Sequence, residues 1–191
     1  MGATQLTRAL THPVQQAFAD PMMRSHPSNG QDKVPQPYST PELLDATRRL
    51  TKLHVALKAY KRGLLEASKT SGIPMSRHTL FCCAIDKVDS AVFEQLASQL
   101  MVGENLAIVP VLAKGKASVT ALVPPDCDCA LGESKKRTAG TAVWHSIWNA
   151  NVTFAPGERV TLDAPIGKPA VLVRQGSEVA QALLAAIDGG L

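Results

Sequence analysis

The chain has 191 residues, 45% of them hydrophobic and 19% charged, and its formal net charge is +4. A chain of this length and hydrophobicity can bury a sizeable core, so we expect a compact fold. The charge excess is modest, and the basic run Lys135 to Arg137 has no aromatic neighbours. This composition argues against a nucleic-acid partner and indicates a solvated loop at the basic run.

The four cysteines do not follow a metal-site pattern. They stand as Cys82-Cys83 and as Cys127 and Cys129, whereas structural zinc sites usually use pairs separated by two to four residues. We expect reduced thiols with no metal and no cofactor; His78, close to the first pair, leaves a metal site as the alternative. No apolar run approaches the ~20 residues of a membrane span, and the N-terminus lacks a signal-peptide core. We therefore expect a cytoplasmic protein with no membrane partner.

The first 38 residues are polar and rich in proline, which predicts a loop with short structured pieces. Ser39 and Glu42 form a capping box around Pro41, which predicts the start of a long helix. One face of this helix is apolar to about Leu65, so a helix of roughly thirty residues would reach ~45 Å. Gly72 and Pro74 are expected to end it. The seven-residue repeat consists of Leu43, Leu50, Leu57 and Leu64.

The hydrophobic period changes after Thr79. Residues Ser90 to Met101 could form a helix, and the segment Asp126 to Gly140 is expected to be an inserted loop. Short β-rich runs separated by Gly, Pro or polar residues predict an antiparallel sandwich or barrel. A closing helix is predicted from Ser177 to Ile187, with Ser177 as its cap. The runs are Leu106 to Leu112, Ser118 to Val123, Val143 to Trp148, Arg159 to Ala164 and Ala170 to Arg174.

The stretch Phe154 to Ser177, FAPGERVTLDAPIGKPAVLVRQGS, resembles the end of glycoside hydrolase family 31 α-glycosidases, whose motif there is VTVxAPLGxxPVFxR. Further blocks follow in the same order as in the family, and this order carries the resemblance. The ending APIGKP is most similar to bacterial α-glucosidases of the sulfoquinovosidase type. The further blocks are Phe18 to His26, Gln36 to Ser39, Leu53 to Tyr60, Glu66 to Pro74, Gln99 to Val111, Val123-Pro124 and Trp144 to Trp148.

The resemblance implies an α+β fold with two parts. Residues 1–78 would be a loop and terminal helix from the end of a catalytic (β/α)8 barrel. Residues 79–191 would be a C-terminal antiparallel β-sandwich domain with a closing helix. It also implies hydrolysis of O-glycosyl bonds of the α-glucoside or α-sulfoquinovoside class, in carbohydrate metabolism.

The resemblance supplies two candidate substrate-binding residues and no catalytic residue. Arg24 and His26 match the family's loop after barrel strand eight, where the histidine lines a sugar subsite; a surface histidine in a proline-rich loop is the alternative. Retaining glycosidases need two carboxyl groups ~5 to 5.5 Å apart, and in the family both aspartates lie on earlier barrel strands. We therefore expect the chain alone to be inactive, and to bind a carbohydrate substrate only when a barrel completes it.

Two hypotheses follow from this resemblance. The chain is either the C-terminal portion of a family 31 enzyme, whose partner is the upstream barrel, or a stand-alone non-catalytic β-sandwich that binds ligands or serves a structural role. The long helix discriminates between them. A barrel-wall helix without its barrel would expose the leucine repeat as an apolar patch, whereas an independent module would bury that repeat against its own strands.

Overall fold

The computed structural model describes residues 40–81, 96, 98–112, 116–125 and 143–189. This part of the chain is α+β, and its strands pair antiparallel, as expected from the sequence. The helices are α2 (Pro41–Ala56), α3 (Lys58–Ser71) and α5 (Glu178–Asp188). The strands are β1 (Ser76–His78), β2 (Leu100–Val102), β3 (Leu106–Val109), β4 (Ser118–Leu122), β5 (Trp144–Ser146), β6 (Asn149–Phe154), β7 (Arg159–Asp163) and β8 (Ala170–Arg174).

Helix α2 begins one residue later than the capping-box prediction. Thr40 is the N-cap, and its Oγ1 accepts a hydrogen bond of 3.3 Å from the Leu43 N–H. Pro41 follows in the first turn, where its missing N–H has no helical partner to lose. The prediction that Ser39 caps the helix is therefore wrong, because the N-cap is Thr40 and its hydroxyl accepts from the Leu43 N–H, three residues on.

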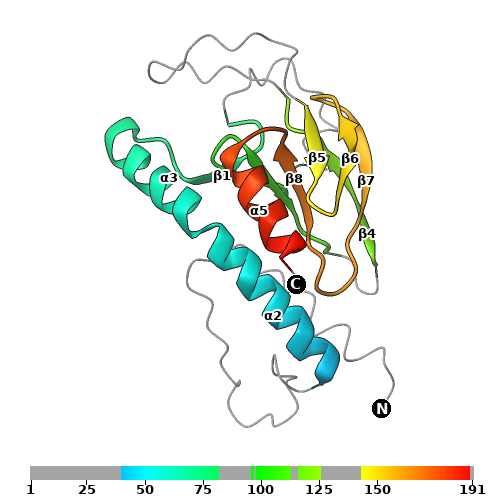
Figure 1. Ribbon diagram of the computed structural model, residues 1–191. Coiled ribbons are helices and arrows are strands. Elements are labelled where there is room, and N and C mark those ends of the chain that lie inside the picture. Colours follow the sequence, from blue (N-terminus) through cyan, green and yellow to red (C-terminus); the bar gives the residue numbers. More distant parts are fainter. Residues whose placement is uncertain (1–39, 82–95, 97, 113–115, 126–142, 190–191) are drawn as a thin grey trace, which may run out of the picture.

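The single long helix of the prediction is divided at Leu57. Its N–H is shared between the carbonyls of Leu53 (3.1 Å) and His54 (3.2 Å), a tighter turn than a regular α-helix makes. Helix α3 continues in nearly the same direction, so the two form one bent rod (Figure 1). As predicted, α3 ends at Gly72, which has a positive φ of 71° and donates to the Ser68 carbonyl at 2.9 Å.

The strands form a six-stranded sheet in the order β1-β2-β3-β8-β5-β6 and a two-stranded sheet of β4 and β7. In the larger sheet Leu106 of β3 stands opposite Val173 of β8, which joins strands far apart in the sequence. In the smaller sheet Val119 stands opposite Leu162. The closing helix α5 starts as predicted, since Ser177 Oγ accepts from the Ala180 N–H at 3.2 Å.

The six-stranded sheet has a covered face on both sides. Helices α2 and α5 lie over one face, where Leu50 and Leu53 pack with Val171, Val173 and Leu183. The two-stranded sheet lies over the other face. The order of layers is therefore helices, large sheet and small sheet (Figure 1). Strand β8 contributes alternate residues to the two cores, as the period of two in a strand requires. The second core includes Ala107, Val109, Ala121, Val160, Leu162 and Leu172.

Most of the leucine repeat of the long helix is buried, and Leu50 and Leu57 belong to the core that the helix shares with the large sheet. Leu43, Leu50 and Leu57 are 2%, 0% and 0% exposed, and Leu64 is half-buried. The exposed leucine patch that we expected of a barrel-wall helix is therefore not found. The reason is that α2 lies directly over β3 and β8, whose valines and isoleucine fill the other half of this core.

Each of the five predicted β-rich runs contains a strand, with some changes at the ends. The predicted helix Ser90 to Met101 is wrong at its C-terminal end, because Leu100 and Met101 belong to β2 and pair with β1 and β3. The predicted run at Val143 shortens, since Ile147 and Trp148 form a turn. Strand β6 was not predicted, because its polar sequence NANVTF lacks an apolar alternation. All positions of the predicted loop Asp126 to Gly140 lie outside the described residues.

Within the described helices, none is long and apolar enough to cross a membrane. This finding agrees with the absence of a long apolar run in the sequence.

Candidate functional site

The two substrate-binding candidates taken from the resemblance, Arg24 and His26, lie outside the described residues, as do all four cysteines. Within the described part, His145 is buried in β5 and its Nδ1 lies 3.1 Å from the Ser146 carbonyl, so it packs in the fold. Asp163 and Asp188 are exposed.

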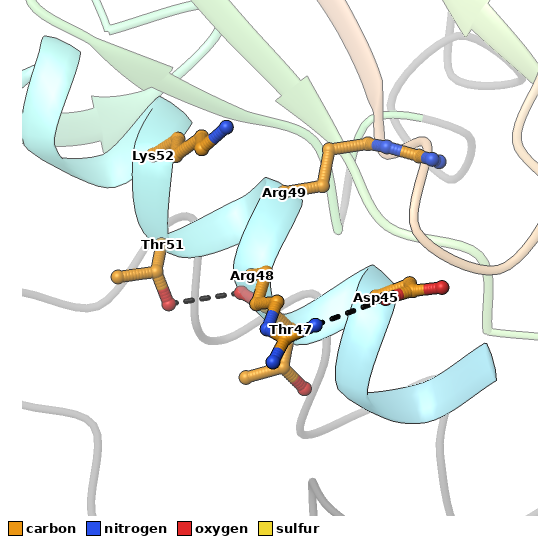
Figure 2. A pocket seen from close by; sticks show the side chains of 6 residues that line it. All are labelled: Asp45, Thr47, Arg48, Arg49, Thr51 and Lys52. Carbon is orange, nitrogen blue, oxygen red and sulfur yellow. Dashed lines mark hydrogen bonds and ion pairs between the residues drawn. The ribbon is translucent and has the colours of Figure 1, made fainter. Parts of the chain in front are cut away.

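A groove of about 560 Å³ runs along the solvent side of α2. We call it the α2 groove, and Figure 2 shows its six lining side chains spreading outward from successive turns of the helix. These side chains occupy α2 because the leucine repeat commits the opposite side of the helix to the sheet core, which leaves the polar side outward. The lining residues are Asp45, Thr47, Arg48, Arg49, Thr51 and Lys52.

An ion pair and a hydrogen bond order the groove locally. Arg48 Nη1 lies 3.5 Å from Asp45 Oδ1, and Thr51 Oγ1 donates to the Thr47 carbonyl at 2.9 Å (Figure 2). The side chains of Arg48 and Asp45 are about two-thirds exposed, 66% and 67%. An ion pair in this much solvent contributes little to stability. Its consequence is local: it neutralises one of the groove's cations.

Arg49 connects the groove to the turn between β7 and β8. A Cβ placed on Gly167 would lie 3.0 Å from Ala46 Cβ and 3.5 Å from Arg49 Nη1. Gly167 also has a φ of +80°, so glycine satisfies both the turn conformation and the close approach to α2. The turn therefore fixes the position of α2, and of the groove, relative to the sheets.

Within the described part of the chain, the lining has the cations Arg48, Arg49 and Lys52 and the carboxylate of Asp45. This arrangement can attract an anionic group, and threonine hydroxyls can hydrogen-bond to a polyol. Among the described residues, no group of three or more His, Cys, Asp or Glu side chains is placed to hold a metal ion.

The sequence contains a signal for this groove that is independent of the hydrophobic periodicity. The run from Arg48 to Lys52 holds three cations in five positions, so Lys135 to Arg137 is not the only local basic run.

A second polar cluster holds α3 to the sheet. The Tyr60 hydroxyl donates to the Val102 carbonyl at 3.0 Å and accepts from the Asn105 N–H at 3.4 Å. Burial raises the pKa of the Tyr60 phenol above its ordinary value, and the hydrogen bond from Asn105 and the charge of Arg77 oppose that increase. The raised pKa keeps the phenol neutral, so it serves as a structural donor and acceptor rather than as a base.

A third polar contact joins the two sheets. The side-chain amide of Gln99, 2% exposed, donates from Nε2 to the Leu122 carbonyl at 2.6 Å and accepts from the Leu122 N–H at 3.2 Å. The amide thus acts as a strand partner at the end of β4, and it satisfies two backbone groups that burial would otherwise leave without a hydrogen bond.

No family model matches the chain. Individual proteins do match it. It is 30% identical over 158 residues to the sulfoquinovosidase of Escherichia coli K12, which covers 83% of this chain and 20% of that enzyme. It is 29% identical over 142 residues to glucoamylase 1 of Schwanniomyces occidentalis, which covers 74% of this chain and 13% of that protein. The chain therefore spans about a fifth or less of the length of these relatives.

Solved structures show the same fold. A family 31 sulfoquinovosidase from E. rectale superimposes with a TM-score of 0.71 at 21% identity, over 93% of this chain and 23% of that chain. A family 31 dextranase of Flavobacterium johnsoniae gives a TM-score of 0.65 at 22% identity, over 86% of this chain and 18% of that chain. The matches agree with each other and with the order of the sequence blocks. The chain therefore belongs to the family 31 glycoside hydrolases, and it corresponds to a C-terminal part of these longer enzymes.

Proposed function

We propose that this chain serves as the C-terminal part of a family 31 α-glycosidase that hydrolyses O-glycosyl bonds of the α-glucoside or α-sulfoquinovoside class in carbohydrate metabolism. The observation that carries the proposal is the match to the E. coli sulfoquinovosidase, in which 83% of this chain corresponds to 20% of the enzyme. A match of this kind indicates which part of a longer enzyme the chain corresponds to, and that part does not amount to a complete active site.

In this proposal residues 1–78 form the end of the catalytic barrel and residues 79–191 form its C-terminal β-sandwich. Helices α2 and α3 correspond to the last barrel helix. Helix α2 joins the two parts, since it packs on the large sheet through Leu50 and Leu53 and turns its charged side outward. The β-sandwich would hold this helix, and through it the preceding loop, in a fixed position.

Arg24 and His26 bind the sugar in this proposal, and the rest of the barrel supplies both catalytic carboxyl groups. The upstream barrel is thus the partner that completes the site. A barrel closes only with all eight strands. We therefore propose that the chain alone does not hydrolyse glycosides.

An activity assay and a sequence determination test the proposal together. Purified chain is incubated with a 4-nitrophenyl α-glucoside and a 4-nitrophenyl α-sulfoquinovoside, and we expect no release of nitrophenol. Turnover that survives further purification would overturn the inactivity of the chain. The genomic DNA and transcript upstream of Met1 are expected to encode an in-frame barrel with two catalytic aspartates; a stop codon and a promoter there would overturn the enzyme assignment.

The role of His26 is tested once a complete barrel is available. The His26→Ala variant of the complete enzyme should raise KM and lower kcat/KM, because it removes a hydrogen-bonding partner of the sugar. His54→Ala is the matched control, since His54 lies at the end of α2. Equal activity of the His26→Ala variant and the unaltered enzyme would remove His26 from the proposed sugar site.

One observation favours the second candidate function, a stand-alone non-catalytic module. The leucine repeat is buried within the chain itself, and Leu50, Leu53 and Leu57 are each 0% exposed. An independent module would unfold in one cooperative transition that tryptophan fluorescence and circular dichroism report at the same denaturant concentration. Non-coincident transitions of the isolated chain would count against the module and for a dependence on further chain.

A further inference from the structure

Strand β6 contains the tripeptide Asn151-Val152-Thr153. Asparagine followed by any residue except proline and then by serine or threonine is the acceptor pattern for asparagine-linked glycans. The other asparagines of the sequence, at positions 29, 105 and 149, are followed two residues later by Gln, Ala and Asn. The pattern therefore occurs once in the sequence, and its position in the fold decides whether it is accessible.

The backbone at Asn151 leaves the regular ladder of the sheet. Trp144 and His145 of β5 stand opposite Phe154 and Thr153, but the next residue, Ser146, stands opposite Asn149. Residues 150–152 of β6 thus face no residue of β5. A bulge of this kind disrupts the local ladder and bends the strand, so Asn151 lies in a segment that a modifying enzyme can approach without breaking paired strands.

Asn151 also lies at the free edge of the sheet. Among the strands that the structure describes, β6 is the last in the order and pairs with β5 alone. Asn151 and Thr153 are exposed, and Val152 between them is 45% exposed. The adjoining turn is held in place, because Trp148 Nε1 donates to the Pro169 carbonyl at 2.8 Å and the Ile147 N–H to the Val171 carbonyl at 3.3 Å. The acceptor segment therefore projects from a fixed turn.

We propose that Asn151 is an acceptor for an asparagine-linked oligosaccharide. The donor is an oligosaccharide attached to a lipid diphosphate. A bond forms between Asn151 Nδ2 and C1 of the first sugar, the bond between C1 and the diphosphate oxygen breaks, and the lipid diphosphate leaves. The amide nitrogen loses one proton, and no oxidant or reductant takes part. The Thr153 hydroxyl completes the pattern that the transferring enzyme recognises.

A glycan at this position would protect the open edge of the sheet. Edge strands present unpaired backbone groups that can recruit another chain, and proteins commonly protect them with charged residues or proline. Strand β6, with the sequence NANVTF, has neither. A bulky hydrophilic oligosaccharide at Asn151 would keep a second strand from pairing there.

The test uses the full chain behind a cleavable secretory leader, translated in the presence of microsomes from endoplasmic reticulum. Chains protected from added protease have entered the lumen. We expect these chains to gain the mass of one glycan, and peptide N-glycosidase to remove it. Absence of a glycan from protease-protected chains would overturn the proposal.

Four variants locate the modification. Asn151→Gln and Thr153→Ala should both lose the glycan, whereas Thr153→Ser should keep it because the hydroxyl remains. Asn149→Gln is the matched control, being exposed on the same strand but outside the pattern, and it should keep the glycan. A glycan that persists in Asn151→Gln would place the modification elsewhere and overturn the assignment.

A glycan at Asn151 would also have a consequence for the localisation of the protein. Attachment of such a glycan requires the lumen of a secretory compartment, whereas the sequence alone led us to expect a cytoplasmic protein. Mass analysis of tryptic peptides from the protein isolated from its own cells compares the two. We expect the peptide that contains Asn151 to carry sugar, and a wholly unmodified peptide would overturn the natural use of this site.

Discussion

Helices α2 and α3 share one leucine repeat, but the fold treats them differently. Four residues of α2 are buried, and three of them, Ala46, Leu50 and Leu53, belong to the core over the large sheet. In α3 the single buried residue is Lys61, while Leu64 is half-buried and Leu65 is 52% exposed. In Figure 1 α2 lies beside α5, with which it is in contact, whereas the far end of α3 extends away from the sheet. The buried residues of α2 are Leu43, Ala46, Leu50 and Leu53.

This difference shows that a periodic apolar pattern identifies the side of a helix that can be buried. The extent of the partner surface then decides how much of that side is actually buried. A helix of fourteen residues is marginal in water without tertiary contacts. Helix α3 depends on its first turns, where the Tyr60 hydroxyl bonds to Val102 and Asn105. We therefore expect α2 to belong to the cooperative core and the end of α3 to open independently.

The largest expected effect comes from the centre of the buried repeat. Leu50→Ala should lower the free energy of unfolding by about 2 to 5 kcal/mol, because it removes buried methyl groups and leaves a cavity. Leu65→Ala, on the exposed side of α3, should change it by at most about 0.5 kcal/mol. Urea unfolding followed by the fluorescence of Trp144 and Trp148 measures both. Similar losses in the two variants would contradict the contrast between the helices.

The next effect concerns the turn against which α3 begins. Gly103 has a φ of +62°, and a Cβ there would meet the Tyr60 hydroxyl and the two terminal methyl groups of Leu64. Gly103→Ala should therefore cost more than the roughly 1 to 2 kcal/mol of a left-handed alanine. Gly157→Ala is the matched control, with φ +80° and nothing within 4 Å of a new Cβ. Equal losses of unfolding free energy would show that the contact with α3 is unimportant.

A smaller effect is expected at Tyr60 itself. Tyr60→Phe removes a hydroxyl that donates to one backbone group and accepts from another, and it should cost about 1 to 3 kcal/mol. Chemical denaturation of the variant and the unaltered chain at neutral pH measures this difference. A loss below about 0.3 kcal/mol would mean that water replaces the hydroxyl without penalty.

The same pair of proteins gives a pH dependence. Burial raises the pKa of Tyr60 above its unfolded value of 10.0, so the folded chain holds the phenolic proton more tightly than the unfolded chain. The associated stability is complete below pH 10.0 and falls as pH rises from there toward the higher folded pKa. The difference in unfolding free energy between the unaltered chain and Tyr60→Phe should shrink over that interval. A constant difference would contradict the raised pKa.

The sequence predicted the elements whose signals are local. Ser177 as a cap, Gly72 as a helix end, the alternating run of β7 and the apolar run of β8 need only neighbouring residues, and all of them are found. Strand β6 was missed, because its polar edge position gives it no apolar pattern. The division at Leu57 was missed as well, since no proline or glycine marks it.

The candidate site was harder to predict than the fold. Arg24 and His26 came from a family resemblance, and they lie outside the described residues, so their role stays a prediction. The α2 groove cannot be predicted from the sequence in this way, because cations on the outer side of a helix are usually solvated surface. What brings its residues to notice is the turn at Gly167, which approaches Ala46 and Arg49 from a distant part of the chain. Such an approach has no local signal in the sequence.

The smallest expected effect tests the end of α3 directly. Lys69 Nζ lies 2.9 Å from Glu66 Oε2, with both side chains about 60% exposed, 61% and 60%. Glu66→Gln should cost only about 0.2 to 0.5 kcal/mol, and it should appear as faster hydrogen exchange of the amides near the end of α3, with global unfolding unchanged. The difference should fade at about 1 M salt, which screens exposed charges.

Asp45→Asn is the matched control for this ion pair, because it removes an equally exposed pair with Arg48 from α2. Since the packed leucines hold α2 in place, its amides should exchange at an unchanged rate at low and high salt. Glu66→Gln could instead leave the local exchange rates unchanged and lower the global unfolding free energy by more than about 1 kcal/mol. That result would show that α3 unfolds together with the core. Coupling the exposed end of α3 to the core would then require a partner surface beyond the contacts that α3 makes in this structure.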